Sequence, residues 1–218
     1  MAHDWSPKTN GIADNTHLRA VGLDDWSAVR QLHGGIFKRL AGILFDDAAA
    51  TTLETHLATP EYTEELAQQN ISVAIVDGHI VGTCGWIASD DHGRAARITS
   101  LFVDPLFTRL GLGRRLVWDA EARARAAGFQ TITTRATEMT VEYFAALGYE
   151  VSSQGVVTPV LDLEIPVLFM RKRDPAATLP PDTRSGNEPE TSDAEPMEKP
   201  QGAVPKFAPA FAFSGTRH

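Results

Sequence analysis

The chain has 218 residues, of which 43% are hydrophobic and 22% charged, as is typical of a globular protein large enough for one core. A net charge of −8 argues against general nucleic-acid binding, which needs a basic face. No apolar run approaches the roughly 20 residues of a membrane span, and the polar start lacks a leader core. A single cysteine, Cys84, excludes an internal disulfide and a cysteine-rich metal site. Together these features predict a cytoplasmic protein without a metal or a membrane partner.

The composition changes near Arg173 and predicts three regions. Residues 174–218 hold eight of the 13 prolines, with seven acidic and four basic residues. Such a segment cannot bury enough apolar surface to offset chain entropy, so we predict a disordered, Pro-rich acidic tail. Its end, FAPAFAF (207–213), fits either a docking segment or a free tail. Residues 1–15 are predicted to be a flexible arm, and residues 16–173 the folded domain.

The first part of this domain predicts one strand followed by two helical stretches. The strand is expected over residues 16–22. Apolar side chains then recur with a helical period from Leu23 to Gly42. The second helical stretch, residues 46–66, is interrupted at Pro60, which lacks the N–H that a helix interior needs.

The middle of the chain predicts antiparallel strands. Residues 71–89 form two β-rich runs around Asp77-Gly78, a dipeptide typical of hairpin turns. Residues 94–105 predict a further strand, which Asp-Pro ends. Because Cys84 lies in an apolar run with no base beside it in sequence, we expect it in the core rather than as a nucleophile.

The next helix, predicted over residues 112–127, begins with cations. Free N–H groups and the dipole make a helix start positive, which favours acids there. Yet two glycines at this start, Gly111 and Gly113, lie among the arginines at 109, 114 and 115. Glycines let the backbone approach a ligand closely, and the first-turn N–H groups point at an anion. The pattern predicts a bound pyrophosphate, although arginines that simply extend into water would explain it equally well.

The end of the domain predicts a strand, a short helix and two last strands. Within the preceding helix, Glu121 and Arg125 are spaced as an ion pair on the solvent side. Residues 129–136 predict the strand, and Thr137 is expected to cap the short helix that stops at Gly148. Apolar stretches around 156–163 and 166–171 complete the order β-α-α-β-β-β-α-β-α-β-β. This order predicts a mixed α/β domain.

Two stretches of the chain resemble the GCN5-related N-acetyltransferase (GNAT) superfamily. LFVDPLFTRLGLGRRLV (101–117) is similar to its acetyl-CoA motif, a strand ending L-x-V-x-P and then [QR]-x-x-G-x-[GA] at a helix start. VEYFAALGYE (141–150) is similar to its short helix of the form [FY]-[YF]-x-x-x-G-[FY]. The resemblance implies the α/β fold of acyl-CoA N-acyltransferases, with a mixed central sheet flanked by about four helices.

The resemblance also implies a site for acetyl-CoA as the acyl donor. Residues 109–114 would hold its pyrophosphate through backbone N–H groups, and the strand end at 101–103 would line the pantetheine arm. The backbone N–H of Leu101 would stabilise the oxyanion. The residues implied in donor binding are Leu101, Phe102, Val103, Arg109, Leu110, Gly111, Leu112, Gly113, Arg114, Thr137 and Phe144.

Three positions depart from the family pattern. Thr108 stands where Gln or Arg begins the pyrophosphate motif, with Arg109 beside it. Arg97 occupies the strand position that often carries a glutamate base. Phe144 occupies the position of the tyrosine that often protonates the departing thiolate, and the adjacent Tyr143 is expected to point elsewhere on the helix.

Several side chains near these positions are candidates for catalysis. Tyr149, just after the short helix, is the candidate acid, although a core aromatic is an equally good interpretation. Glu164 or Asp162 is the candidate to bind or deprotonate an amine, although a solvated strand face explains both. His33, on the first helix, could meet the substrate, although a histidine on a helix surface usually has no role.

The sequence therefore predicts an N-acetyltransferase that moves an acetyl group from acetyl-CoA to a primary amine of a small molecule, by direct transfer in a ternary complex. The acceptor site is predicted to include Phe37, Phe45, Trp86 and Glu164, which would suit an amphipathic amine. Two alternatives stay open: a non-catalytic CoA-binding sensor or structural module, and an enzyme that acetylates protein N-termini or lysines. A homodimer is compatible with the sequence.

Overall fold

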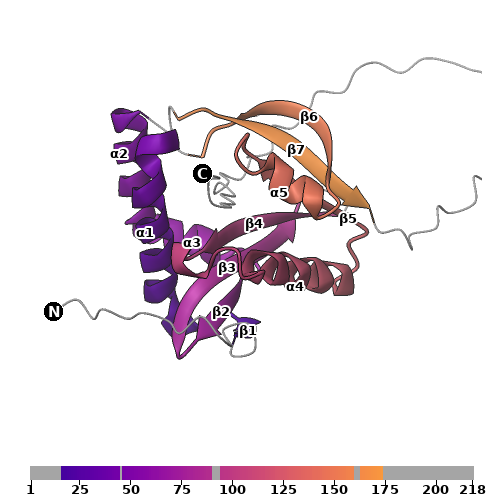
Figure 1. Ribbon diagram of the computed structural model, residues 1–218, viewed down its shortest axis with the longest axis horizontal. Helices are drawn as coiled ribbons and strands as arrows, with labels where there is room; N and C mark the ends of the chain where they lie inside the picture. Colours follow the sequence, from indigo (N-terminus) through magenta and orange to yellow (C-terminus); the bar gives the residue numbers. More distant parts are fainter. Residues whose placement is uncertain (1–15, 45, 90–93, 160–162, 174–218) are drawn as a thin grey trace, which may run out of the picture.

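A central mixed sheet organises the chain. In the computed structural model this sheet has seven strands in the order β1-β2-β3-β4-β5-β7-β6, with α-helices packed on both faces (Figure 1). The predicted arm and tail, including residues 207–213, lie outside the described residues. The structure describes residues 16–44, 46–89, 94–159 and 163–173.

The N-terminal half follows the predicted order. Pro60 begins a new helix instead of interrupting one, because its missing N–H is harmless at the first helical position. The Thr59 side chain caps this helix by accepting from the N–H of Tyr62. The elements are β1 (His17–Ala20), a 3-10 turn (Leu23–Asp25), α1 (Trp26–Leu44), α2 (Asp47–Leu57), α3 (Pro60–Ala67), β2 (Ser72–Val76) and β3 (His79–Ala88).

The C-terminal half follows the predicted order, with one strand and one cap corrected: the strand expected around 156–163 lies at residues 150–157 instead. Gly128 and Gly148 end their helices with φ values of 99° and 89°, a conformation that favours glycine. Thr140 rather than Thr137 is the N-cap of α5, and its hydroxyl accepts from the N–H of Thr137 at 2.9 Å. The elements are β4 (Ala95–Val103), a 3-10 turn (Pro105–Phe107), α4 (Leu112–Ala126), β5 (Thr131–Ala136), α5 (Val141–Ala146), β6 (Glu150–Val157) and β7 (Ile165–Arg173).

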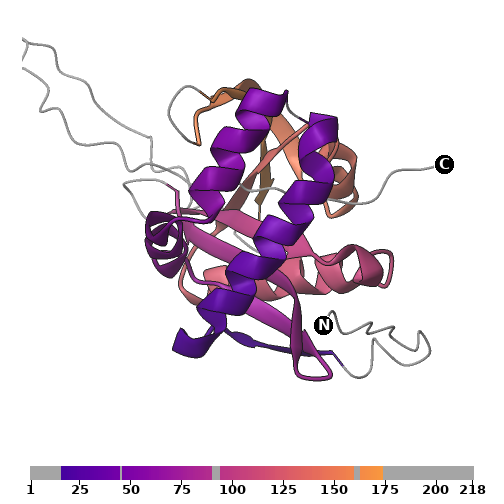
Figure 2. The same ribbon diagram turned by 90° about the vertical axis from the view of Figure 1, so that its left-hand side faces the viewer.

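The sheet separates two apolar cores. Helices α4 and α5 cover one face, and α1, α2 and α3 cover the other; Figure 2 shows α1 and α2 side by side across the sheet. We call these clusters the α4-side core and the α1-side core. The α4-side core includes Ile98, Leu101, Leu116, Ile132 and Phe144. The α1-side core includes Val29, Phe37, Leu53, Leu66, Phe102 and Ile165.

Strands β4 and β5 start as parallel neighbours and then separate. They pair only where Ala95–Arg97 meets Thr131–Thr133, although β4 continues to Val103 and β5 to Ala136. The rest of β4 stays paired with β3 on its other side. Within the described chain, the backbone edge of β4 that faces β5 therefore has no strand partner over residues 98–103.

A bulge interrupts β4 beside this opening. The register with β3 shifts by one residue between Thr99 and Phe102, so that Ser100 and Leu101 together oppose Cys84. Ser100 has a φ of 49°, in the left-handed region, which costs a residue other than glycine about 1–2 kcal/mol. A bulge of this kind redirects the side chains that follow it.

The bulge decides which side chains of β4 meet each core. Ala96 and Ile98 lie in the α4-side core before the bulge, in the alternation expected of a strand. The extra residue then brings Leu101 and Val103 into the same core, while Phe102 enters the α1-side core. The segment 101–103 thus ends β4 beside the start of α4.

Gly34 is a position where we expect alanine to stabilise the fold. It lies inside α1, and within the described chain an added Cβ would find open space. Gly34→Ala should raise the free energy of unfolding in urea by about 0.5–1 kcal/mol. Gly78→Ala is the matched control, because its Cβ also has open space but its φ is +80°. It should cost about 1–2 kcal/mol, and equal effects of both changes would contradict this account.

Candidate active site

The turn between β4 and α4 leaves the helix start open. Gly111, the N-cap of α4, has a φ of 78° and no side chain to fill the cap, and no acid lies in the first turn. The N–H of Arg115 bonds to the Gly111 carbonyl at 3.1 Å, which closes the first helical turn. The N–H groups of Leu112, Gly113 and Arg114 precede that bond and have no partner within the helix. Such a helix start suits an anion.

The three arginines around this turn have different surroundings. Arg115 donates to the Thr16 carbonyl at 3.1 Å and so holds the segment before β1. The Arg114 guanidinium lies over the Trp118 ring, 5.7 Å from its centroid. Arg109 is exposed and has a φ of 65°. Arg109 and Arg114 are therefore the cations that could neutralise an anion here, whereas Arg115 has a structural contact.

The structure places Tyr143 against this helix start, although the sequence analysis expected it to point elsewhere. A Cβ on Gly113 would lie 3.0 Å from the Tyr143 hydroxyl oxygen and 3.7 Å from Val103 Cγ2. The ends of β4, α4 and α5 thus meet at one point. The expectation was wrong because two consecutive residues of α5 face inward: Phe144 packs into the α4-side core and Tyr143 turns toward α4.

The Tyr143 hydroxyl suits a ligand. It is buried, and within the described residues it has no hydrogen-bond partner. A buried polar group in that state costs roughly 1–3 kcal/mol, so an accepting ligand atom would be favoured beside it. Burial also raises the pKa of Tyr143, and the hydroxyl therefore keeps its proton at neutral pH and can donate it in a hydrogen bond.

Tyr149 lies in a different environment from Tyr143, and its role as the acid stays a prediction. Its hydroxyl donates to Glu121 Oε1 at 2.8 Å, and Lys172 donates to both Glu121 oxygens at 3.0 and 2.9 Å. Glu121 is eight residues beyond Gly113 on α4, about 12 Å along the helix axis. Burial and the Glu121 carboxylate raise the pKa of Tyr149 well above its ordinary value. This geometry gives Tyr149 a structural role between α4 and β7.

The same network corrects the expectation that Glu121 faces solvent. Only 3% of Glu121 is exposed, and besides Tyr149 and Lys172 it meets Arg125 at 3.2 Å. The spacing of Glu121 and Arg125 did predict their ion pair. It could not reveal Lys172, which comes from a strand 51 residues further along the chain.

Glu164 and the aromatic acceptor candidates are not brought together. Glu164 is exposed just before β7, and its neighbours Leu163 and Ile165 turn into the α1-side core, so Glu164 points to the other side. Phe37 lies in the α1-side core, whereas Trp86 lies in the α4-side core, on the opposite face of the sheet. The other two candidates, Asp162 and Phe45, lie outside the described residues.

The remaining donor-site candidates lie around the opening in different orientations. The Phe102 side chain turns into the α1-side core and stacks on His33 with centroids 3.9 Å apart, so only its backbone borders the opening. Phe144 is buried, Thr137 is half-buried in the turn before α5, and Leu110 is exposed in the turn before α4. The roles of these residues in donor binding stay predictions.

Two arginines lie on the α1 side of the sheet where β4 and β5 separate. Arg97, at the position of the expected base, is 6% exposed; burial and the nearby Arg135 cation lower its pKa to about 10. The Arg135 guanidinium lies over the Phe169 ring at 5.8 Å.

His33 is fully buried, which corrects the expectation of a surface residue. Its Nδ1 lies 2.7 Å from the Tyr62 hydroxyl and its Nε2 lies 2.8 Å from Thr83 Oγ1. The available signal was its spacing, because His33 stands four residues from both Val29 and Phe37 on the apolar stripe of α1. Burial lowers the pKa of His33 to about 3, so the ring is neutral at physiological pH.

We expect His33 to make the stability of the protein depend on pH. Its folded pKa of about 3 lies below the ordinary value of 6.5, so at intermediate pH only the unfolded chain binds the proton. The contribution of neutral His33 to the free energy of unfolding is therefore complete above pH 6.5. It is lost by about 1.4 kcal/mol per pH unit as the pH falls below that value. Urea unfolding between about pH 7 and about pH 5 should show the extra slope in the wild type and lose it in His33→Gln; equal slopes would contradict it.

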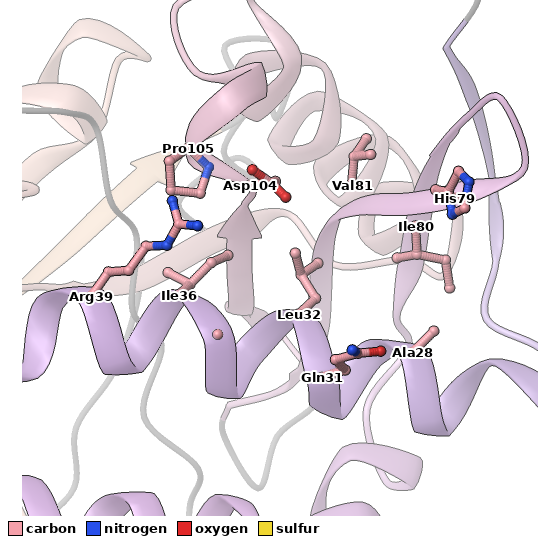
Figure 3. Close-up of a pocket in the computed structure, with 11 residues that line it drawn as sticks. Ala28, Gln31, Leu32, Ile36, Arg39, His79, Ile80, Val81, Asp104 and Pro105 are labelled. Carbon is pink, nitrogen blue, oxygen red and sulfur yellow. The ribbon is translucent and has the colours of Figure 1, made fainter. Parts of the chain in front are cut away.

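A hollow of about 820 Å³ adjoins the C-terminal end of β4, where Asp104 and Pro105 line it. Leu32 and Ile36 point into it from α1, and Ile80 lines it from β3 (Figure 3). Arg39, His79 and Asp104 supply polar groups. Asp104 begins the segment that leads to the start of α4, so the hollow and the open helix start belong to neighbouring parts of the molecule.

The chain belongs to the acetyltransferase (GNAT) family. The model of that family matches residues 40–149, which is half of the chain and includes the splayed strands, the start of α4 and α5. Among curated protein sequences, none matches the chain significantly. Within the described ranges, no helix is both long and apolar enough to cross a membrane.

Solved structures share the fold at low sequence identity. A GCN5-related N-acetyltransferase from Rhodopseudomonas palustris gives a TM-score of 0.62 at 20% identity, over 73% of this chain and 96% of that one. The PaiA N-acetyltransferase from Thermoplasma acidophilum, in complex with coenzyme A, gives 0.59 at 12% identity, over 73% and 99%. A protein from Salmonella typhimurium with its cofactor acetyl-CoA gives 0.54 at 20% identity, over 75% and 97%.

Proposed function

We propose that the chain is an acetyl-CoA-dependent N-acetyltransferase that acts on a primary amine of a small molecule by direct transfer. The observation that carries this proposal is the meeting of three features: the splayed edge of β4, the open start of α4 and the unpartnered Tyr143 hydroxyl. Two of the similar structures hold coenzyme A or acetyl-CoA, which supports the same donor here. A cytoplasmic location is part of the proposal.

The residues fit acetyl-CoA part by part. The first-turn N–H groups of α4, with Arg109 and Arg114 nearby, suit a pyrophosphate. Among the described residues, the edge of β4 at 98–103 has no strand partner on the β5 side, so it suits an extended arm that carries amide groups. The Tyr143 hydroxyl supplies a hydrogen-bond donor where β4, α4 and α5 meet.

The chemistry needs few side chains. Acetyl-CoA supplies an acetyl thioester: a bond forms from the amine nitrogen to the acetyl carbon, the carbon–sulfur bond breaks, the amine loses a proton and the thiolate gains one. We assign the Leu101 N–H to the developing oxyanion and the Tyr143 hydroxyl, in place of Tyr149, to a hydrogen bond that stabilises the departing thiolate, which takes its proton from water because burial raises the pKa of Tyr143. Cys84 is buried as expected, and burial raises its pKa, which disfavours it as an acyl carrier and supports direct transfer.

We assign the approach of the amine to the hollow beside α1, because it adjoins the segment leading to α4 and has an apolar floor with a polar rim. Gly35 lines this hollow and a Cβ there has open space. Gly35→Leu should raise the KM for the amine about tenfold and leave acetyl-CoA binding unchanged. Gly34→Leu on the same helix is the matched control. An unchanged KM in Gly35→Leu, measured by steady-state kinetics, would contradict the assignment.

The amine panel in the test contains neutral, cationic and carboxylate-bearing members. Thiol release from acetyl-CoA that depends on an amine would support the proposed function.

Two other outcomes of this test would each favour one of the two alternative functions. Saturable acetyl-CoA binding without thiol release from any amine would favour a CoA-binding sensor or structural module. Thiol release only with peptides, together with acetylated N-termini or lysines found by mass spectrometry, would favour a protein acetyltransferase. An absence of acetyl-CoA binding would overturn all three interpretations.

A further inference from the structure

We propose that His33 is a positioning residue that acts through Thr83 to hold the bulge of β4, and thereby aims the Leu101 N–H at the acetyl group. This inference rests on the proposed function, since it assigns the Leu101 N–H to the donor. The residues that hold the bulge, His33, Tyr62 and Thr83, come from α1, α3 and β3 and are buried.

Tyr62, His33, Thr83 and Ser100 are linked by successive hydrogen bonds, which we call the His33 hydrogen-bond series. The donor and acceptor in each bond follow from a single assignment. Thr83 has one hydroxyl proton, which it donates to the Ser100 carbonyl at 2.8 Å. His33 Nε2, 2.8 Å from the same oxygen, must therefore donate to it. In the neutral ring Nδ1 then carries no proton and accepts from the Tyr62 hydroxyl at 2.7 Å. In this arrangement the polar side-chain atoms of Tyr62, His33 and Thr83 all have hydrogen-bond partners.

The His33 hydrogen-bond series ends at the peptide bond between Ser100 and Leu101. The N–H of this peptide bond is the group that we assign to the oxyanion. The Ser100 carbonyl and the Leu101 N–H belong to the same planar unit, and in a trans peptide they point in opposite directions. Thr83 draws the carbonyl toward β3. The Leu101 N–H is therefore turned away from β3, which is the direction of the opening between β4 and β5.

The bulge needs such support because Ser100 adopts the left-handed conformation with a φ of 49°. Its side chain is held as well as its carbonyl: Ser100 Oγ donates to Gln69 Oε1 at 2.8 Å, and Thr99 donates to the same atom at 2.6 Å. His33 also stacks on Phe102, the residue after Leu101. Thr83 and Gln69 thus hold the bulge, and His33 contacts both Thr83 and Phe102.

The test compares four variants of the full chain, one of which is His33→Gln. Thr83→Val keeps the shape of the side chain but removes the hydroxyl that donates to Ser100. Thr83→Ser keeps the hydroxyl and should restore function. Thr134→Val is the matched control, because Thr134 is also buried but its hydroxyl has no hydrogen-bond partner within the described residues.

Two measurements separate a positioning role from a merely structural one. In the free protein, the amide resonance of Leu101 should move in Thr83→Val and stay in place in Thr83→Ser and Thr134→Val. With acetyl-CoA and the most active amine of the panel, Thr83→Val should lower kcat about 100-fold, the usual loss of one oxyanion donor. The Kd for acetyl-CoA, measured by calorimetry, should change less than about twofold. His33→Gln should lower kcat in the same direction.

Three results would overturn the inference. An unmoved Leu101 resonance in Thr83→Val would show that the His33 hydrogen-bond series does not hold the bulge. A moved resonance with unchanged kcat would show that the bulge geometry does not serve catalysis. If the wild type binds no acetyl-CoA, the proposed function fails and the catalytic role of His33 fails with it; the resonance of the free protein tells this case apart from the other two.

Discussion

Gly113→Glu is expected to abolish acetyl-CoA binding while the fold survives. The new side chain would start 3.0 Å from the Tyr143 hydroxyl and bring a negative charge to the helix start that we assign to the pyrophosphate. In the wild type, acetyl-CoA at 100 times its Kd should add about 2.7 kcal/mol to the free energy of unfolding. Thermal unfolding should then show a rise in Tm of roughly 2–4 °C per kcal/mol, which Gly113→Glu should lack.

A matched variant separates the position from the charge. Ala122 is exposed on the same helix, so Ala122→Glu adds an equal charge about 14 Å further along α4. We expect it to keep the full rise in Tm with acetyl-CoA. A Gly113→Glu protein that still gains stability from acetyl-CoA would refute the cradle at the start of α4.

The second large effect is expected from Tyr143→Phe, which should lower kcat about 100-fold if Tyr143 serves the departing thiolate. Its stability should not fall, because the hydroxyl that is removed is buried and has no partner within the described residues. Steady-state kinetics with acetyl-CoA and an active amine measure kcat, and urea unfolding measures the stability.

Tyr149→Phe is the matched control, since it makes the same chemical change six residues later. It removes the hydrogen bond to Glu121 and should cost about 1–2 kcal/mol of stability, with kcat unchanged. The reverse pattern, in which Tyr149→Phe alone lowers kcat, would return the acid role to Tyr149 and reject Tyr143.

Much of the fold could be predicted because its signals are local. The turn at Asp77-Gly78, where both residues have positive φ, and the stops at Gly128 and Gly148 depend on the conformations that only a few residues adopt easily. The helical period of α1 and α4 depends on one apolar face each. The family resemblance then supplied the arrangement of these elements. The separation of β4 from β5 is encoded by no local pattern.

The candidate site was predicted less well, because its side chains are set by contacts between distant segments. Tyr143 meets Gly113 only when α5 packs beside α4. Glu121 is buried by Lys172 and Tyr149 from later strands and loops. His33 bonds to Thr83, 50 residues away, and its place on the apolar stripe of α1 was the one sequence signal of that burial.

The most direct test of the proposed function is the fate of a labelled acetyl group. The full chain is mixed with isotopically labelled acetyl-CoA and the amine panel, and mass spectrometry follows the label while free thiol is measured. We predict equal amounts of free thiol and labelled amine, with no label on the protein. Label retained on the protein would contradict direct transfer, and acetyl-CoA that stays intact with every amine would contradict the assignment as an N-acetyltransferase.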